Sequence, residues 1–194
     1  MMEENQRLYS EILDIWKKFC SRIGFNINVY RKSDITNGGA TKTLFIEAVD
    51  KGENYKLFQT FHQRDFWLEF IDWPNKLNCI YESSVSRDIE LSIWEKDFFE
   101  RIFKSNRIDS GNSLFDSTFS GYSNDKEFMN KVFQDYEIQN ILLKERLLIL
   151  NVKTENSILR ISLKNMHDAY YTVEELEHNY KKFKYIVERV LKFI

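Results

Sequence analysis

The chain has 194 residues, a net charge of −2, and 28 Lys and Arg residues against 30 Asp and Glu residues. This length suits one globular domain, and a hydrophobic fraction of 43% excludes extended disorder. The balanced charge argues against a dedicated nucleic-acid-binding protein, which would usually carry a basic excess.

The sequence shows neither the pattern of a secretory signal nor that of a membrane-spanning segment. The segment 1–10 is polar and acidic where a secretory signal would have a basic end and an apolar run. The most apolar stretch, 141–152, is interrupted by charges and is too short to cross a bilayer. Cys20 and Cys79 are expected as buried thiols rather than a disulfide framework. Frequent Asn, Lys and Ile residues are typical of an AT-rich bacterial genome, so we expect a bacterial cytoplasmic protein.

Apolar residues at helical spacing predict an amphipathic helix at the N-terminus, ending at Gly24. They are Leu8, Ile12, Ile15, Trp16, Phe19 and Ile23. From 26 to about 94 the period falls to two, which predicts antiparallel strands with one face toward the core. The alternating residues are Leu44, Ile46, Ala48, Tyr55, Leu57, Gln59, Phe61, Phe66, Leu68, Phe70, Ile89, Leu91 and Ile93.

A short helix is predicted over 95–104, and the polar segment 106–113 is the best candidate for a boundary. The chain is therefore expected to form one domain, 1–194, or two lobes, 1–105 and 106–194. The first lobe would contain a helix and antiparallel strands. The second would contain a strand, a helix, a hairpin and a helix.

The C-terminal half shows the signals for these elements in order. A strand is predicted over 118–122. Asn124 and Glu127 have the spacing of a capping box, followed by one helical face with Phe128, Val132, Phe133 and Tyr136. An apolar strand over 147–152 turns at 154–156 into the alternation of Leu159, Ile161 and Leu163. Thr172 and Glu175 form a second capping box before the last helix. The predicted fold class is α+β, with an antiparallel sheet bracketed by N- and C-terminal amphipathic helices.

Catalytic and metal-binding patterns are weak. Ser113 follows Gly111 as in a nucleophile elbow, but Phe115 replaces the second glycine. His62, His167 and His178 lack zinc spacing, although Glu174 and His178 lie one helical turn apart. Asp116 is expected to accept backbone N–H bonds in a turn. We therefore expect no catalytic residue, no metal site and no cofactor.

One stretch resembles a family. Ile108, Ser110, Gly111, Phe115, Asp116 and Phe119 occupy the places of an I-x-[TS]-G-x-x-x-F-D-x-x-F pattern. This pattern is found in uncharacterised bacterial domains, and the resemblance covers the C-terminal half, 108–194. It implies a fold and not a reaction. In that fold Gly111 would permit a tight turn, while Phe115 and Phe119 would anchor the chain on the core.

Possible binding surfaces say more about function than the catalytic and metal-binding patterns do. The last helix carries Lys181, Lys182, Lys184, Arg189 and Lys192 beside a broad apolar face. We interpret it as a core-packing helix with a solvated basic face, rather than a helix that lies on a membrane or a partner.

Aromatic residues occupy both parities of the strand pattern between 55 and 94, which exceeds the need of one covered face. This predicts a partner-binding sheet surface rimmed by acids. Its residues are Glu47, Trp67, Glu69, Asp72, Trp73, Asp88 and Glu90.

The sequence therefore favours a non-enzymatic protein-binding domain. A specific form is an immunity protein that neutralises a toxin with a basic surface. The alternative is a small hydrolase with a carboxylate and histidine site assembled in space, for example from His62, Glu69 and Glu90.

Overall fold

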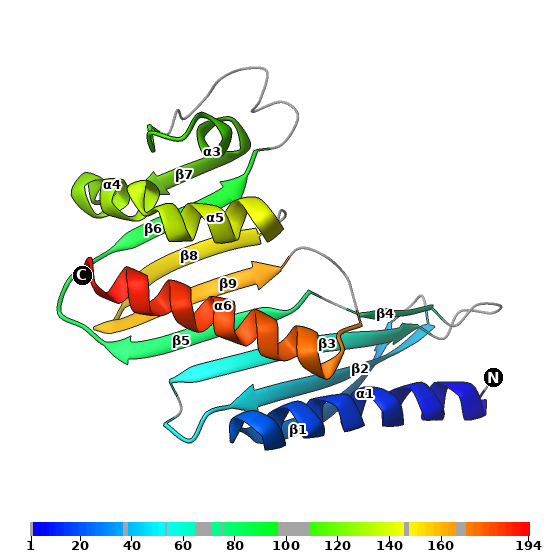
Figure 1. Cartoon of the computed structure of the whole chain (residues 1–194). Helices are drawn as coiled ribbons and strands as arrows, with labels where there is room; N and C mark the ends of the chain where they lie inside the picture. The colour runs from blue at the N-terminus through cyan, green and yellow to red at the C-terminus, as the bar shows by residue number, and fades with distance from the viewer. Residues whose placement is uncertain are drawn as a thin grey trace. The chain divides into compact units, whose positions relative to one another are not determined.

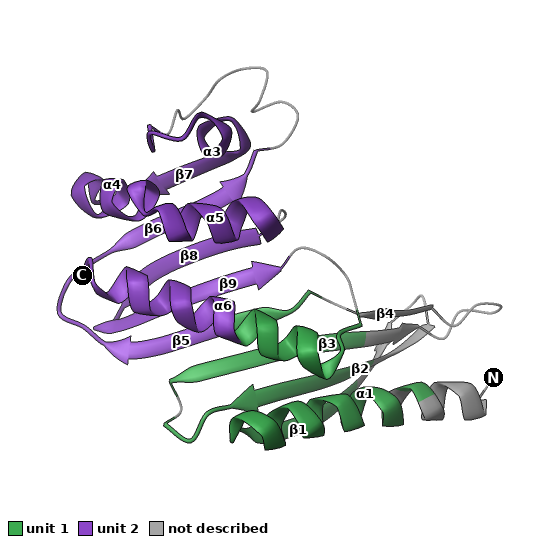
Figure 2. Ribbon diagram, viewed as in Figure 1, with its two compact units in different colours: residues 1–79, 167–180 green, residues 80–166, 181–194 purple. Residues whose placement is uncertain are grey.

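The computed structural model describes residues 2–36, 39–52, 54–64, 71–74, 76–96, 109–145, 148–165 and 170–194. The chain divides into two compact units (Figure 2). Unit 1 comprises Met1–Cys79 and His167–Tyr180, and unit 2 comprises Ile80–Met166 and Lys181–Ile194. Each unit draws on both halves of the sequence, so the division cuts across the boundary expected at 106–113.

Unit 1 combines one N-terminal helix with antiparallel strands (Figure 1). Its elements are α1 (Met2–Ile23), β1 (Asn26–Thr36), β2 (Gly39–Val49), β3 (Tyr55–Arg64) and β4 (Ile71–Pro74). Strand β2 pairs with β1 and β3, and β4 pairs with β3, each time antiparallel. The strand expected over 66–70 lies outside the described residues.

Helix α1 is formed and ended as its sequence predicts. Trp16 and Phe19 are buried, and their rings meet edge to face at a centroid distance of 5.9 Å. Gly24 has a φ of 76°, which lets the chain turn back so that the Phe25 N–H donates to the Cys20 carbonyl at 2.9 Å. The Cys20 thiol is buried, and this burial raises its pKa to about 11. Cys79 is buried too, so both thiols are as expected.

The strands of unit 1 sort their side chains onto two faces. On β2, Leu44, Ile46 and Ala48 are buried, while the residues between them are half-buried. Helix α1 packs on β1 and β2. Ring contacts of Phe61 with Tyr170 and of Tyr55 with Tyr180 place the start of α6 on the face that carries Leu44 (Figure 2). Among the described residues of unit 1, no helix lies on the opposite face.

Unit 2 pairs its strands antiparallel in the order β7, β6, β8, β9. Its elements are β6 (Glu90–Glu95), α3 (Ser113–Thr118), β7 (Phe119–Ser123), α4 (Lys126–Gln134), α5 (Tyr136–Glu145), β8 (Leu148–Glu155) and β9 (Ile158–Asn165). Two further elements, β5 (Asn78–Ser84) and α6 (Val173–Leu191), contribute residues to both units.

Alternating residues of three strands form the sheet side of the unit 2 core. They are Leu91, Ile93, Leu148, Leu150, Val152, Leu159, Ile161 and Leu163, all buried. Strands β8 and β9 are joined by a two-residue turn, because Glu155 is paired with Ile158. Asn156 and Ser157 have φ values of 51° and 61°, as a type I′ turn requires. The turn residues are therefore 156 and 157, whereas the sequence predicts a turn at 154–156.

Several helix boundaries differ from the predictions. Glu95 belongs to strand β6 rather than to a helix, and the segment 97–104 lies outside the described residues. Helix α3 is not anticipated from the sequence. The N-cap of α4 is Asp125 rather than Asn124. Tyr136, expected on the buried face of that helix, is 66% exposed, because Asp135 ends α4 and α5 begins after it.

The α+β fold class is confirmed. The strand pairings within each unit are antiparallel, and amphipathic helices α1 and α6 stand at the two ends of the chain. Buried side chains expected from the sequence include Trp16, Phe19, Leu148, Leu150, Ile161, Leu176, Phe183 and Val187, and all of them are buried. Among the described residues, no helix is both long and apolar enough to cross a membrane.

The core of unit 2 predicts the cost of a cavity. Leu150 is fully buried on the central strand β8. We expect Leu150→Ala to lower the free energy of unfolding by about 2–5 kcal/mol in chemical denaturation, since it removes buried methyl groups and leaves a void. Leu114→Ala is the control, because Leu114 is 60% exposed, and its effect should stay within about 0.5 kcal/mol. Equal effects of the two substitutions would contradict this packing.

Candidate functional site

The structure describes three of the seven predicted partner-binding side chains. Glu47 lies on β2 in unit 1, whereas Asp88 and Glu90 lie in unit 2, just before and at the start of β6. Trp67 and Glu69 lie outside the described residues. Asp72 and Trp73 belong to β4, whose backbone alone is described.

Glu47 stands in the middle of the unit 1 sheet face that faces away from α1. The pairing register places Tyr30, Phe45 and Thr60 in one row across the strands. The next row on the same face is Asn28, Glu47 and Phe58. We call these six residues the open face. Tyr30 is 57% exposed, and the other five are half-buried.

The electrostatic feature of the open face is a carboxylate set among aromatic rings. Asn28 Nδ2 donates a hydrogen bond to Glu47 Oε2 at 3.1 Å. Phe58 is the register partner of Glu47 on β3, and Phe45 precedes it by two residues on the same face. The described residues place no cation within ion-pair distance of this carboxylate. The six residues of the open face therefore carry one negative charge among aromatic rings, and Lys56 is the diagonal neighbour of that charge on β3.

On the other face of the unit 2 sheet, which does not carry Leu150, two bases form ion pairs with acids. Lys153 forms an ion pair with Glu155 and is the register partner of Glu90. Arg160 Nε donates to Glu82 Oε1 at 2.7 Å. Asp88 is exposed. Two of the four acids named here, Glu155 and Glu82, are thus paired with bases, while Glu90 and Asp88 add negative charge to this part of the predicted surface.

Side chains on this second face are also engaged with one another. Ser92 Oγ donates to Asn151 Oδ1 at 2.8 Å between β6 and β8. Tyr122 on β7 is the register partner of Ser92 and is exposed. The described residues of this face are therefore largely polar, with the exposed ring of Tyr122 beside the Ser92–Asn151 hydrogen bond.

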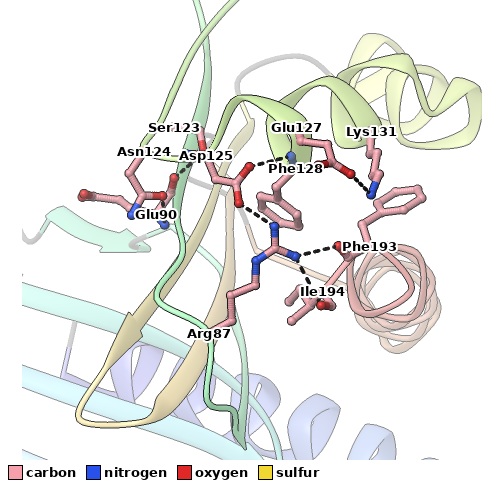
Figure 3. Close-up of polar contacts among 10 residues, drawn as sticks. All are labelled: Arg87, Glu90, Ser123, Asn124, Asp125, Glu127, Phe128, Lys131, Phe193 and Ile194. Atoms are coloured by element: carbon pink, nitrogen blue, oxygen red, sulfur yellow. Dashed lines mark hydrogen bonds and ion pairs between the residues drawn. The ribbon is translucent and has the colours of Figure 1, made fainter.

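A cluster of polar contacts joins three distant segments of unit 2 at Arg87 (Figure 3). Arg87 Nη2 donates to Asp125 Oδ2 at 2.5 Å, and Nη1 donates to the carbonyls of Phe193 and Ile194 at 3.4 and 3.3 Å. The other oxygen of Asp125 accepts from the Phe128 N–H at 3.0 Å as the N-cap of α4. The Phe128 N–H, and next the Arg87 guanidinium, hold the pKa of Asp125 below its usual value.

The neighbouring residues of the cluster fasten β6 to the same point. Asn124 Oδ1 accepts from the Glu90 N–H at 2.8 Å, and Ser123 Oγ donates to the Glu90 carbonyl at 2.6 Å. Lys131 and Glu127 form an ion pair one helical turn apart on α4 (Figure 3). The contacts at this point are made to backbone groups or to an opposite charge, so the cluster fastens segments of unit 2 together, and we call it the latch.

The motif that carries the family resemblance builds a turn, as expected. Asp116 Oδ1 accepts from the backbone N–H and the hydroxyl of Ser110, at 3.0 and 2.6 Å. Gly111 has a φ of 77°, a conformation that favours glycine. Phe115 and Phe119 are buried and stacked at 4.9 Å. Ile108 lies outside the described residues, and the resemblance itself stays a prediction.

Sequence reasoning missed the partners that reach this turn from a distance. Asn112 Nδ2 donates to Oε1 of the buried Gln139 at 2.8 Å. Gln139 Nε2 also donates to the Phe133 carbonyl at 2.5 Å. The sequence signal is limited to an amide on the otherwise apolar face of α5, which predicts a buried partner without identifying it.

The basic face of α6 is partly occupied by structural ion pairs. Arg189 Nε donates at 2.8 Å to the Asp135 carboxylate, which is only 1% exposed. Asp135 also accepts the Glu137 and Ile138 N–H groups at the start of α5. Lys182 pairs with Glu145 at 2.8 Å. These two pairs fasten α5 to α6, so two of the five predicted basic residues serve packing.

The histidines do not form a described site. The side chain of His62 and the whole of His167 lie outside the described residues. His178 is exposed, and Glu174, one turn before it, accepts from Arg22 Nη1 at 2.9 Å. Within the part of the chain that the structure describes, no three His, Cys, Asp or Glu residues gather as metal ligands would.

Comparisons of this chain with protein-family models, with curated proteins and with solved structures found no match.

The latch predicts a stability that depends on pH. Asp125→Asn keeps an N-cap oxygen and removes the charge that faces Arg87. Because the folded-state pKa of Asp125 is lowered, its stabilisation is present above the ordinary value of 3.8 and is lost as the pH falls through the folded value. The difference in unfolding free energy between wild type and variant should be constant above about pH 5 and shrink in acid. Denaturant titrations from neutral to acidic pH would refute this if the difference widened in acid.

Proposed function

We propose that this chain is a non-enzymatic bacterial cytoplasmic domain that binds another protein through the open face. One observation carries the proposal. The helices described in unit 1 lie on one side of its sheet, while Tyr30, Phe45 and Phe58 stand on the other side. Aromatic rings on a sheet face that no described helix covers are the kind of side chain that most often anchors protein interfaces.

The charge of the open face supports a partner with a basic surface. Glu47 is a carboxylate whose described hydrogen-bond donor is the neutral Asn28 amide, and it lies in the middle of the aromatic rows. Charge of this kind acts mainly on the rate and the specificity of association, while the rings supply buried apolar area. A toxin whose active site binds an anionic substrate has such a basic surface. The specific form of the proposal is therefore an immunity protein that covers that site.

The hydrolase alternative has less support from the described residues. Ser110 and Asp116 bond to each other in a turn, Asp135 is held by Arg189, and Glu174 is held by Arg22. These carboxylates have structural partners, and a hydrolytic site requires groups that converge on a substrate. Of the candidates named from the sequence, Glu90 lies at the start of β6, and the side chains of His62 and Glu69 lie outside the described residues.

The proposal is tested by toxin protection and by direct binding. The product of each neighbouring gene that arrests growth is co-expressed with the chain, and the affinity of the purified pair is measured by calorimetry. Tyr30→Ala should weaken binding about tenfold and reduce protection, because it removes an exposed anchor ring from the open face. Glu47→Lys should weaken binding further by placing a cation against a basic partner.

The matched control is Tyr136→Ala, which removes a ring of similar exposure from α5 in unit 2. It should leave affinity and protection unchanged. Full binding by Tyr30→Ala with loss in Tyr136→Ala would move the interface to the helices. A chain that binds no toxin and hydrolyses a substrate would overturn the proposal. Glu69→Lys and Glu90→Lys extend the same series to the other acids predicted from the sequence.

A further inference from the structure

We infer that Glu47 and the rings beside it form a receptor site for an arginine side chain of the partner. The inference rests on the proposed function and adds the chemical group that the open face recognises. It starts from the position of Glu47. Asn28 is its register partner on β1, and Phe58 is its register partner on β3. Directly opposed residues of antiparallel strands have Cβ atoms about 4.5–5.5 Å apart, so the carboxylate is flanked on both sides.

Aromatic residues flank Glu47 across the strands and along its own strand. Phe58 lies across from Glu47, and Phe45 lies two residues along β2 on the same face. Tyr30 is opposite Phe45 and therefore diagonal to the carboxylate. Phe45 and Phe58 are half-buried and Tyr30 is exposed, so the site is open toward solvent.

The carboxylate has spare hydrogen-bonding capacity. Asn28 Nδ2 occupies Oε2, whereas Oε1 accepts no hydrogen bond from a described residue. Lys56 lies diagonal to Glu47 on β3, yet the structure shows no ion pair between them. A half-buried carboxylate with one neutral donor gains from a cation that brings several N–H groups.

Arginine meets these requirements better than lysine does. Its guanidinium is planar, so it stacks on aromatic rings while it donates two parallel hydrogen bonds to one carboxylate. The lysine ammonium is a strongly hydrated point charge and loses more hydration beside phenylalanine rings. The site therefore prefers arginine to lysine, and a neutral isostere of arginine should bind more weakly than either.

The test uses a small probe that requires no partner protein. The purified full chain is titrated with N-acetyl-arginine methylamide, and backbone and aromatic NMR shifts are followed. The lysine and citrulline analogues are titrated in parallel. The arginine probe should shift signals of Asn28, Phe45, Glu47 and Phe58, and its affinity should exceed that of the lysine probe about threefold and that of the citrulline probe about tenfold.

Variants assign the interaction to the site. Glu47→Gln keeps the shape of the side chain and should weaken the arginine probe about tenfold. Phe58→Leu keeps apolar volume and should remove most of the preference for arginine over lysine. Glu137→Gln, at an exposed glutamate of α5, is the control and should change neither value.

Each outcome of these titrations either supports or overturns the arginine site. Equal responses to arginine and citrulline, shifts elsewhere on the surface, or an unchanged response in Glu47→Gln would overturn the arginine site. If these occur while Tyr30→Ala still weakens toxin binding, the arginine inference fails and the proposed function stands. If the arginine probe behaves as expected and no toxin binds, the proposed function fails and the arginine site stands.

Discussion

The pleat of the unit 1 strands is the constraint on which the rest of this account depends. Successive side chains of a strand point to opposite faces, so Leu44 and Ile46 turn toward the core while Phe45 and Glu47 turn away. Helix α1 and the first turns of α6 cover one of these faces. The aromatic residues of the other parity are therefore left on a surface with no described helix over it. A one-residue shift in register would exchange the two faces, so burial under α1 also fixes which rings face solvent.

In unit 2 the polar side chains hold distant segments of the chain together. Arg87, Asp135 and Arg189 join segments that are far apart in the sequence, and each bonds to a helix end or to an opposite charge. Because Asp135 is buried, removing Arg189 would leave an uncompensated charge in the core. Glu47 differs from these groups. It is half-buried, it has one neutral donor, and its surroundings are aromatic, which is why it carries the functional argument.

Sequence reasoning succeeded where a signal is local and periodic. The alternation at Ile161 and Leu163, the end of α1 at Gly24 and the Thr172–Glu175 capping box are all confirmed. Sequence reasoning chose the wrong residue where two neighbouring residues are both suited to the same role. Asn124 and Asp125 are both good caps, and the choice depends on Arg87 and on the Glu90 N–H, which are distant in sequence. The alternation of the strand places Glu47 on the solvent-facing side of the sheet. Its neighbours Asn28 and Phe58 depend on which strands pair and in which register, and residue spacing alone does not predict that.

The central claim is that the aromatic side chains opposite α1 are open to solvent in the free protein. The most direct measurement is the relaxation enhancement that a soluble nitroxide produces on assigned aromatic protons. We expect strong enhancement for the exposed Tyr30 and clear enhancement for the half-buried Phe45 and Phe58. Phe19 and Phe61 should show almost none, because both are buried between the helices and the sheet. Protection of Tyr30, Phe45 and Phe58 equal to that of Phe19 would show that this face is covered, and it would contradict the account.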